Sequence, residues 1–368
     1  MINKERLITR FMEYVQIDSE SKNEKAIAEK LINDLGDMGL EIHTDDTRKM
    51  TGSSTNNIYA FLQGNENEEP LLFTAHMDTV IPGNGIIPNI DGNYIKSGEN
   101  TILGGDDKAG ITAIIEAIKT IKENNLNNRP IEILFTVCEE IGLLGAKNFD
   151  YNLIRSKNAV VLDSSGAAGK IIIQAPCIYK MDVKITGKAS HAGTSPEEGI
   201  NAIIVASEAI SSMKLLRIDK ETTANIGSIS GEGPTNIIQD KVEMEFEIRS
   251  LSEDKAKFQI EHMLECLNKS ADKHGASIKY SISCGNRLFS IDKDNEFVKF
   301  IENKNEKIGV TSNITFSTGG FDANILNNNG INTVVLSVGT ENVHTTKERL
   351  NIIEFEKLSK LVLELMIV

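Results

Sequence analysis

Residues 71–78 read LLFTAHMD, a continuous apolar run that ends in a histidine and an aspartate. Similar apolar runs occupy residues 57–62, 131–137 and 159–162. A stripe of isoleucines between them marks one face of a helix: Ile111, Ile114, Ile115, Ile118 and Ile121. Continuous apolar strands separated by helices are typical of a largely parallel sheet that is covered on both faces. The sequence therefore predicts an α/β fold around these runs.

The pattern changes at about Ile178. Three segments now alternate apolar and polar residues with period two, and helical stretches follow the first and the second of them: 181–186, 242–248 and 278–283. Two helices on one face of an antiparallel sheet would explain this pattern. We therefore expect residues 178–287 to form a smaller α+β domain. It would be inserted into a larger domain made of residues 1–177 and 288–368.

The chain has 368 residues, and its 53 acidic and 39 basic side chains give a formal net charge of −14. This balance argues against nucleic acid and anionic membranes as partners, because both attract a basic face. No run approaches the ~20 apolar residues of a membrane helix, and the first residues lack the apolar core of a signal peptide. Four cysteines without a C-x-x-C pair indicate reduced thiols. We expect a cytoplasmic protein.

His76 and Asp78 are two positions apart, so their side chains point the same way if the strand continues. This spacing suits a metal-binding imidazole whose second nitrogen is oriented by a carboxylate. An H-x-D triplet by itself is a weak signal, because it also occurs as a local hydrogen bond on a surface. A loop rich in proline, glycine and asparagine follows, over residues 82–100.

Residues 103–110, LGGDDKAG, open the helix with the isoleucine stripe. They are not a phosphate loop, because Ile111 stands where the lysine is required. The G-x-G-x-x-G of dinucleotide-binding folds is also absent. An aspartate at a helix start caps free N–H groups. Capping explains one of Asp106 and Asp107, but not both.

Three further apolar runs lead into acidic residues or a histidine: Glu139 and Glu140, Asp163, and His344. In open α/β sheets the ligand crevice lies beyond the carboxyl ends of the strands. We therefore expect these side chains to meet His76 and Asp106 at one edge of the sheet. Thr345 and Glu348 have the spacing of a capping box that opens the next segment.

Histidine and carboxylate ligands without thiolate suit zinc, or a related divalent ion, in a catalytic site. One carboxylate can bridge two ions about 3.5–4 Å apart, as in many metal hydrolases. Neighbouring side chains diverge, so one of two adjacent glutamates can bind metal while the other acts as general base. The residues thus predict a catalytic site for a divalent metal ion, in which a shared carboxylate could hold a second ion.

The whole chain, with these motifs in order, resembles the co-catalytic zinc metallopeptidases. That family includes peptidase T, carboxypeptidase G, aminoacylase and succinyl-diaminopimelate desuccinylase. Five motifs carry the resemblance: residues 76–78, 104–110, 139–142, Asp163 and 342–345.

The resemblance implies a site with two Zn²⁺ ions, which Mn²⁺ or Co²⁺ could replace. It implies that His76 and Asp163 bind one ion, that Glu140 and His344 bind the other, and that Asp106 bridges them. It further implies that Asp78 lies beside the ligands and that Glu139 is the general base. It also suggests a cis peptide bond between Asp106 and Asp107.

The inserted segment resembles the family's lid domain, which often mediates homodimerisation. His191 matches the lid histidine that helps to stabilise the oxyanion. Asn236 and Arg249 match positions that contact substrate, and Arg249 is expected to hold its carboxylate. A turn role for Asn236 and a surface ion pair for Arg249 remain open. Gly320 lies in a stretch, residues 319–324, that resembles the glycine-rich substrate loop of the peptidase T branch.

One residue departs from that branch. Peptidase T has an arginine directly before the paired glycines, where this chain has Thr318, and this argues against strict tripeptide specificity. We expect a metal-dependent aminopeptidase that acts on small peptides. A carboxypeptidase or N-acyl-amino-acid deacylase with the same site is the alternative within enzymes. A non-catalytic binding protein and a metal-storing role are the alternatives outside them.

Overall fold

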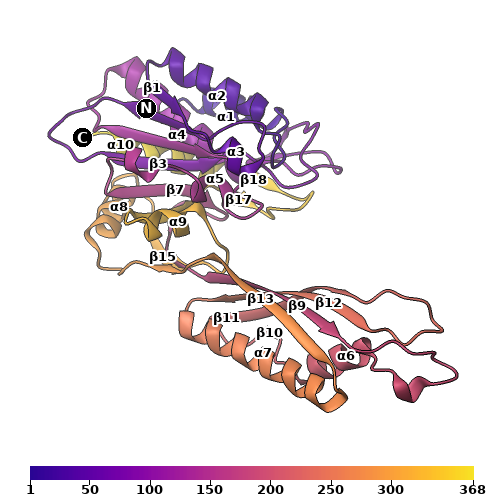
Figure 1. Cartoon of the computed structure of the whole chain (residues 1–368). Helices are drawn as coiled ribbons and strands as arrows, with labels where there is room; N and C mark the ends of the chain where they lie inside the picture. Colours follow the sequence, from indigo (N-terminus) through magenta and orange to yellow (C-terminus); the bar gives the residue numbers. More distant parts are fainter. The chain divides into compact units, whose positions relative to one another are not determined.

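The structure, a computed structural model, describes residues 1–368 and divides into two compact units. The first unit comprises Met1–Gln174, Phe289–Phe316 and Phe321–Val368, and the second comprises Ala175–Leu288 and Ser317–Gly320 (Figure 1). The short segment 317–320 is therefore the one part of the second unit that lies outside its main stretch of sequence.

The first unit is built on a nine-stranded sheet. Its strands, in sheet order, are β1 (Glu41–Thr44), β2 (Ile58–Leu62), β6 (Ile131–Thr136), β3 (Leu71–His76), β7 (Asn158–Ser164), β16 (Asn332–Ser337), β8 (Lys170–Ala175) and β14 (Phe289–Ser290), with β15 (Asn313–Phe316) paired to β8. The central strands β6, β3, β7 and β16 run parallel, while β2 and β8 flank them in antiparallel pairing. The expected α/β fold with a largely parallel sheet is confirmed.

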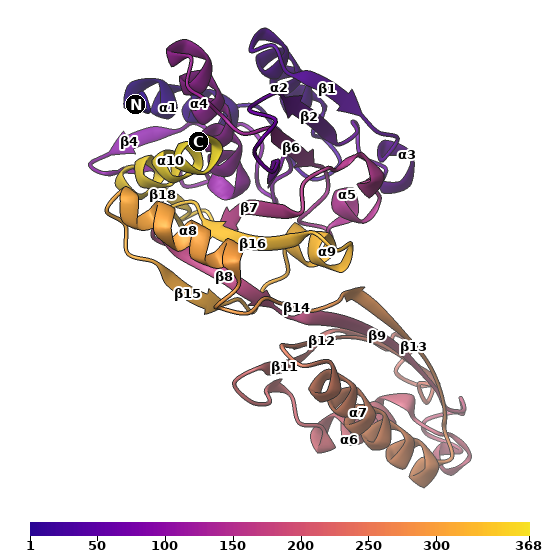
Figure 2. The same ribbon diagram turned by 90° about the vertical axis from the view of Figure 1, so that its left-hand side faces the viewer.

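Helices cover both faces of this sheet (Figure 2). On one face α4 (Gly105–Asn124) packs on β3 and β7 and against α1 (Lys4–Val15) and α10 (Ile352–Met366). On the other face α5 (Leu144–Lys147) and α9 (Asp322–Asn328) lie together, over a cluster that includes Leu72, Leu134 and Leu326. The remaining helices of the unit are α2 (Lys25–Asp37), α3 (Arg48–Thr51), the 3₁₀ turn η1 (Tyr151–Leu153) and α8 (Glu296–Lys307). Most residues of the expected isoleucine stripe and strands are buried, which explains why apolar periodicity located them.

A small antiparallel sheet joins distant parts of the first unit. Its strands, in sheet order, are β17 (Thr340–Glu341), β18 (Arg349–Asn351), β5 (Tyr94–Lys96) and β4 (Asn89–Asp91). The expected loop over residues 82–100 is therefore wrong for β4 and β5, which are too short to show a period. The capping box expected at Thr345 and Glu348 is also wrong. Strand β18 follows them, and the Glu348 side chain instead accepts the backbone N–H groups of Leu103, Gly104 and Asp106.

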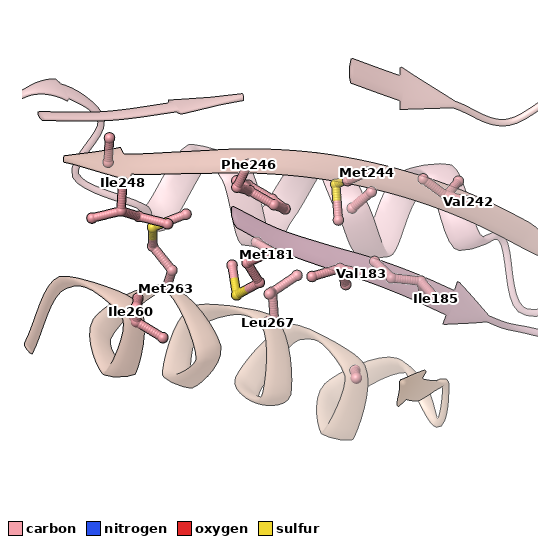
Figure 3. Close-up of a cluster of buried hydrophobic side chains, with 14 of the residues drawn as sticks. Met181, Val183, Ile185, Val242, Met244, Phe246, Ile248, Ile260, Met263 and Leu267 are labelled. Carbon is pink, nitrogen blue, oxygen red and sulfur yellow. The ribbon is translucent and has the colours of Figure 1, made fainter. Parts of the chain in front are cut away.

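The second unit is a five-stranded antiparallel sheet with two helices and a 3₁₀ turn, η2 (Pro196–Glu198). The strand order is β10 (Leu216–Arg217), β11 (Thr222–Ser230), β12 (Lys241–Ser250), β9 (Cys177–Thr186) and β13 (Ser277–Asn286). Both α6 (Ala202–Ser212) and α7 (Glu253–His274) pack on it, and alternate residues of β9 and β12 point at α7 (Figure 3). This alternation is the physical source of the period-two pattern in the sequence.

Candidate metal centre

The carboxyl ends of the parallel strands bring together the residues that the sequence singles out. His76 is the last residue of β3 and pairs in register with Thr136, the last residue of β6. Glu139 and Glu140 follow β6, and Asp163 is the sixth residue of the parallel strand β7. Since parallel strands end at the same edge of a sheet, these side chains converge there.

Asp106 lies between the two histidines and contacts both. Its Oδ1 is 3.1 Å from Nε2 of His76, and its Oδ2 is 3.3 Å from Nε2 of His344. Nε2 of each histidine also lies near a second carboxylate. Nε2 of His76 is 3.6 Å from Oδ1 of Asp163, and Nε2 of His344 is 2.9 Å from Oε1 of Glu140. The site therefore consists of two His–carboxylate groups that share Asp106.

The charges in this site are crowded. Burial and the charge of Asp163 raise the pKa of Glu139 well above its ordinary value, and burial and the charge of Asp106 do the same to the pKa of Asp163. Hydrogen bonds to Asp106 and Glu140 raise the pKa of His344 to about 10. Burial works against ionisation of Asp106, yet its hydrogen bonds to His344 and His76 hold its pKa below the ordinary value. So many carboxylates at one place need compensating positive charge.

The donor set fits divalent metal ions. Ligand atoms of His76, Asp106 and Glu140 lie within 4.8 Å of one another, as do those of His76, Glu139 and Asp163. Imidazole and carboxylate donors suit zinc and related ions, and the excess negative charge of the cluster is what two cations would neutralise.

Asp78 connects the end of β3 to the loop after β6. It is fully buried, and its carboxylate accepts the backbone N–H groups of Glu139 (2.9 Å) and Glu140 (3.2 Å). The Ser21 hydroxyl donates to the same carboxylate at 2.7 Å. The backbone oxygen of Asp78 also lies 2.9 Å from Nδ1 of His76, so that Nδ1 carries the proton and Nε2 faces the metal position.

Glu24 supports the same loop and was missed by sequence reasoning. It is fully buried and accepts from the backbone N–H (3.1 Å) and the thiol (3.2 Å) of Cys138, and from the Ser53 hydroxyl (2.6 Å). Cys138 has φ = 53°, a left-handed conformation that a side chain adopts only when its surroundings hold it. Glu24 and Ser21 are far from any motif in the sequence, so no local signal marks them.

The second unit carries the other expected residues, and it brings His191 and Asn236 together. His191 forms a β-bridge with Ile237, and the Asn236 carbonyl accepts the N–H of Ala192 at 2.9 Å. Nδ1 of His191 accepts the N–H groups of Gly193 (3.1 Å) and Thr194 (3.2 Å). The neutral ring therefore carries its proton on Nε2, which is left as a donor.

Arg249, on β12, is already paired. Its Nε donates to Oε1 of Glu247 at 2.7 Å, and its Nη1 donates to the carbonyl of Thr318 at 3.3 Å. Gly320, two residues further on, packs against Asn286, and a Cβ at this position would meet that side chain at 3.3 Å. The structure thus brings Arg249 and the segment 317–320 together within the second unit.

Comparison with known proteins agrees with these observations. The model of a peptidase dimerisation domain matches residues 178–275, and the model of peptidase family M28 matches residues 57–194. The aminopeptidase PepT of Bacillus cereus is 42% identical to this chain, with a TM-score of 0.92 and coverage of 99% of this chain and 98% of that one. A tripeptidase of Staphylococcus aureus is 37% identical, with a TM-score of 0.96 and coverage of 100% and 98%. The chain belongs to the peptidase T branch of the M20 metallopeptidases.

Membership of the M20 family confirms the family resemblance and makes the chain a metal-dependent peptidase. The relationship extends over the full length: the uncharacterized protein YqjE of Bacillus subtilis is 42% identical over 98% of both chains. No helix of this M20 chain is long and apolar enough to span a bilayer.

Proposed function

We propose that the chain is an aminopeptidase that releases the N-terminal residue of small peptides at a site holding two Zn²⁺ ions. The observation that carries the metal site of this proposal is the position of Asp106, with one carboxylate oxygen toward His76 and the other toward His344. In this proposal His76 and Asp163 would hold one ion, Glu140 and His344 would hold the other, and Asp106 would be shared by both. Mn²⁺ or Co²⁺ would suit the same donors.

Glu139 is the general base of this proposal. Zinc, when bound, supplies positive charge that lowers the pKa of water and polarises the peptide carbonyl. Glu139 is 8% exposed, and its raised pKa suits a group that takes a proton from water and passes it to the leaving amine. Asp78 fixes the backbone of Glu139 and so directs this carboxylate.

The inserted segment, residues 178–287, is the lid domain in this proposal and the surface through which two copies pair. The match to a peptidase dimerisation domain supports that role. His191 would donate from Nε2 to the oxyanion that forms as the carbonyl is attacked. Asn236, Arg249 and Gly320 would contact the peptide, with Arg249 on its carboxylate. The cytoplasmic location expected from the sequence stays part of the proposal.

The names of the two solved relatives, an aminopeptidase and a tripeptidase, favour an exopeptidase that needs a free amino terminus. A library of di-, tri- and tetrapeptides, each with a free and an acetylated amino terminus, tests this with zinc-loaded protein. We expect cleavage of the free peptides one residue at a time from the amino end. Cleavage confined to the acetylated peptides would show a deacylase instead, and release from the carboxyl end would show a carboxypeptidase.

A further inference from the structure

Glu348 is a buried carboxylate whose partners are backbone N–H groups of a distant loop. It is 2% exposed. Its Oε2 accepts from Leu103 and Gly104, each at 2.8 Å, and its Oε1 accepts from Asp106 at 3.0 Å. Successive backbone N–H groups of this kind form an anion-binding concavity. Here the protein fills that concavity with its own side chain.

The two glycines before Asp106 fit this arrangement. Gly104 has φ = 70°, a left-handed conformation that a glycine adopts without steric cost. A Cβ on Gly105 would lie 3.1 Å from Oε1 of Glu348 and 2.9 Å from Cγ2 of Thr340. The paired glycines therefore allow the backbone to wrap closely around the carboxylate of Glu348, and capping of α4 does not require both of them.

Glu348 also belongs to the loop that carries His344, four residues earlier. This loop has positive φ values at Asn342 (55°) and His344 (62°), so neighbouring contacts must hold its shape. An ion pair between Glu341 and Arg349, with Nε of Arg349 2.8 Å from Oε2 of Glu341, closes its base. Glu348 lies next to that closure and reaches across to residues 103–106. A single side chain thus connects the backbone of Asp106 to the loop of His344.

We propose that Glu348 is a positioning residue, which fixes the backbone of residues 103–106 so that Asp106 reaches both metal positions at once. This inference rests on the proposed function, because it takes Asp106 as the bridging ligand. Glu348 would not touch metal or substrate. Its effect would pass through the N–H of Asp106, as outer hydrogen-bond partners of metal ligands commonly do.

The substitution Glu348→Gln tests the inference, because it keeps the size of the side chain but turns one oxygen into an NH₂ group. The NH₂ group cannot accept a hydrogen bond, so it would oppose a backbone N–H that the carboxylate oxygen now accepts. Glu132 provides a matched control. It is also fully buried, and it accepts the N–H groups of Arg155 (2.9 Å) and Ser156 (2.7 Å) together with the Tyr59 hydroxyl. It is the second residue of β6, at the end opposite the metal site.

Zinc affinity of full-length E348Q, E132Q and wild type would be measured by competition with a chromophoric chelator. The visible absorption of the cobalt-loaded proteins would report the geometry of each ion. We expect E348Q to bind at least one ion about 10- to 100-fold more weakly, with an altered cobalt spectrum. E132Q should keep wild-type affinity and spectrum even though it unfolds at a lower temperature. Wild-type affinity and spectrum in E348Q would overturn the inference.

If E348Q does not fold, Gly105→Ala is the second test, because its new methyl group would lie 3.1 Å from Oε1 of Glu348 and would press on that carboxylate as well as on Thr340. Weakened zinc binding in folded G105A supports the role of Glu348, and wild-type affinity contradicts it. A wild-type protein that binds no divalent ion would refute the proposed function itself. Two ions bound with equal affinity in wild type and E348Q would refute only the role of Glu348.

Discussion

The Asp78 carboxylate accepts the backbone N–H of Glu139 at 2.9 Å. Asp78 follows the strand that ends in a proposed metal ligand, and Glu139 is the proposed base in a different loop. The hydrogen bond therefore sets the distance between metal and base through the backbone, and it leaves the side chain of Glu139 free for proton transfer.

Asp78→Asn should lower kcat about 10- to 100-fold, because the amide opposes one of the N–H groups that the carboxylate accepts. Zinc content should stay near wild type, since Asp78 is not a proposed ligand. Steady-state kinetics and elemental analysis of the same preparation check both points. Unchanged kcat would show that the Asp78 contact does not position the base.

Glu139→Gln should retain both zinc ions and lose hydrolysis by about 10²- to 10⁴-fold, because the amide cannot accept the proton of water. KM should change little, which single-turnover and steady-state assays would show together. Near-normal turnover in this variant would exclude Glu139 as the base.

His344→Ala should lose one of the two ions, because it removes the nitrogen that faces both Asp106 and Glu140. Elemental analysis after gel filtration would show about one zinc per chain. His43→Ala is the control, since His43 lies on β1 at the edge of the sheet and should leave two zinc ions in place. Two tightly bound ions in H344A would contradict its assignment as a ligand.

Arg249→Ala should raise KM roughly 10-fold for peptides with a free carboxyl terminus, the size expected when a charged hydrogen bond is lost. Peptides with an amidated carboxyl terminus should show no such change. Glu247→Gln should shift KM of the free-carboxyl peptides in the opposite direction, because it releases Arg249 from its present partner. Equal effects on both kinds of peptide would mean that Arg249 is only a structural ion pair.

The thiol of Cys177 should resist alkylation at neutral pH. Burial, followed by the charge of Glu253, raises its pKa to about 11, so at pH 8 roughly one molecule in a thousand carries a thiolate. The folded pKa lies above the ordinary value of 9.0, so this group costs no stability below pH 9 and destabilises the fold as the pH rises toward 11. Peptide mass spectrometry after iodoacetamide treatment would measure the alkylation of Cys177, with Cys266 as the more exposed comparison. Rapid labelling of Cys177 at pH 8 in the folded protein would contradict the prediction.

Much of the fold could be predicted because burial is periodic. Leu7, Phe11, Tyr14 and Val15 are all buried in α1, as their spacing indicates. The helix expected after residues 242–248 is α7, and its ends were less predictable. It begins three residues before and ends five residues after the stretch 256–269, whose apolar spacing predicts a helix, because the polar ends of a helix carry no apolar signal. Strands β4 and β5 were missed, since three residues are too few to show a period.

The candidate site, like the fold, could be predicted only in part. The proposed ligands could be found because each lies near the end of an apolar run or at the start of the isoleucine helix, and the structure places them close to one another. Their supports could not, because Glu24, Ser21 and Glu348 act on backbone N–H groups or side chains far away in the sequence. Glu348 was even assigned to its own loop as part of a capping box. Nothing local distinguishes a glutamate that caps its neighbour from one that reaches 245 residues along the chain.

The sharing of Asp106 between His76 and His344 has a consequence for how the protein is made. His76, Asp106, Glu140 and Asp163 all precede the second unit in the sequence, whereas His344 follows it. Because chains are synthesised from the amino terminus, a growing chain has the ligands for its first ion long before it has those for the second. The metal centre would therefore be completed only near the end of translation, and an unfinished chain would have no dinuclear site.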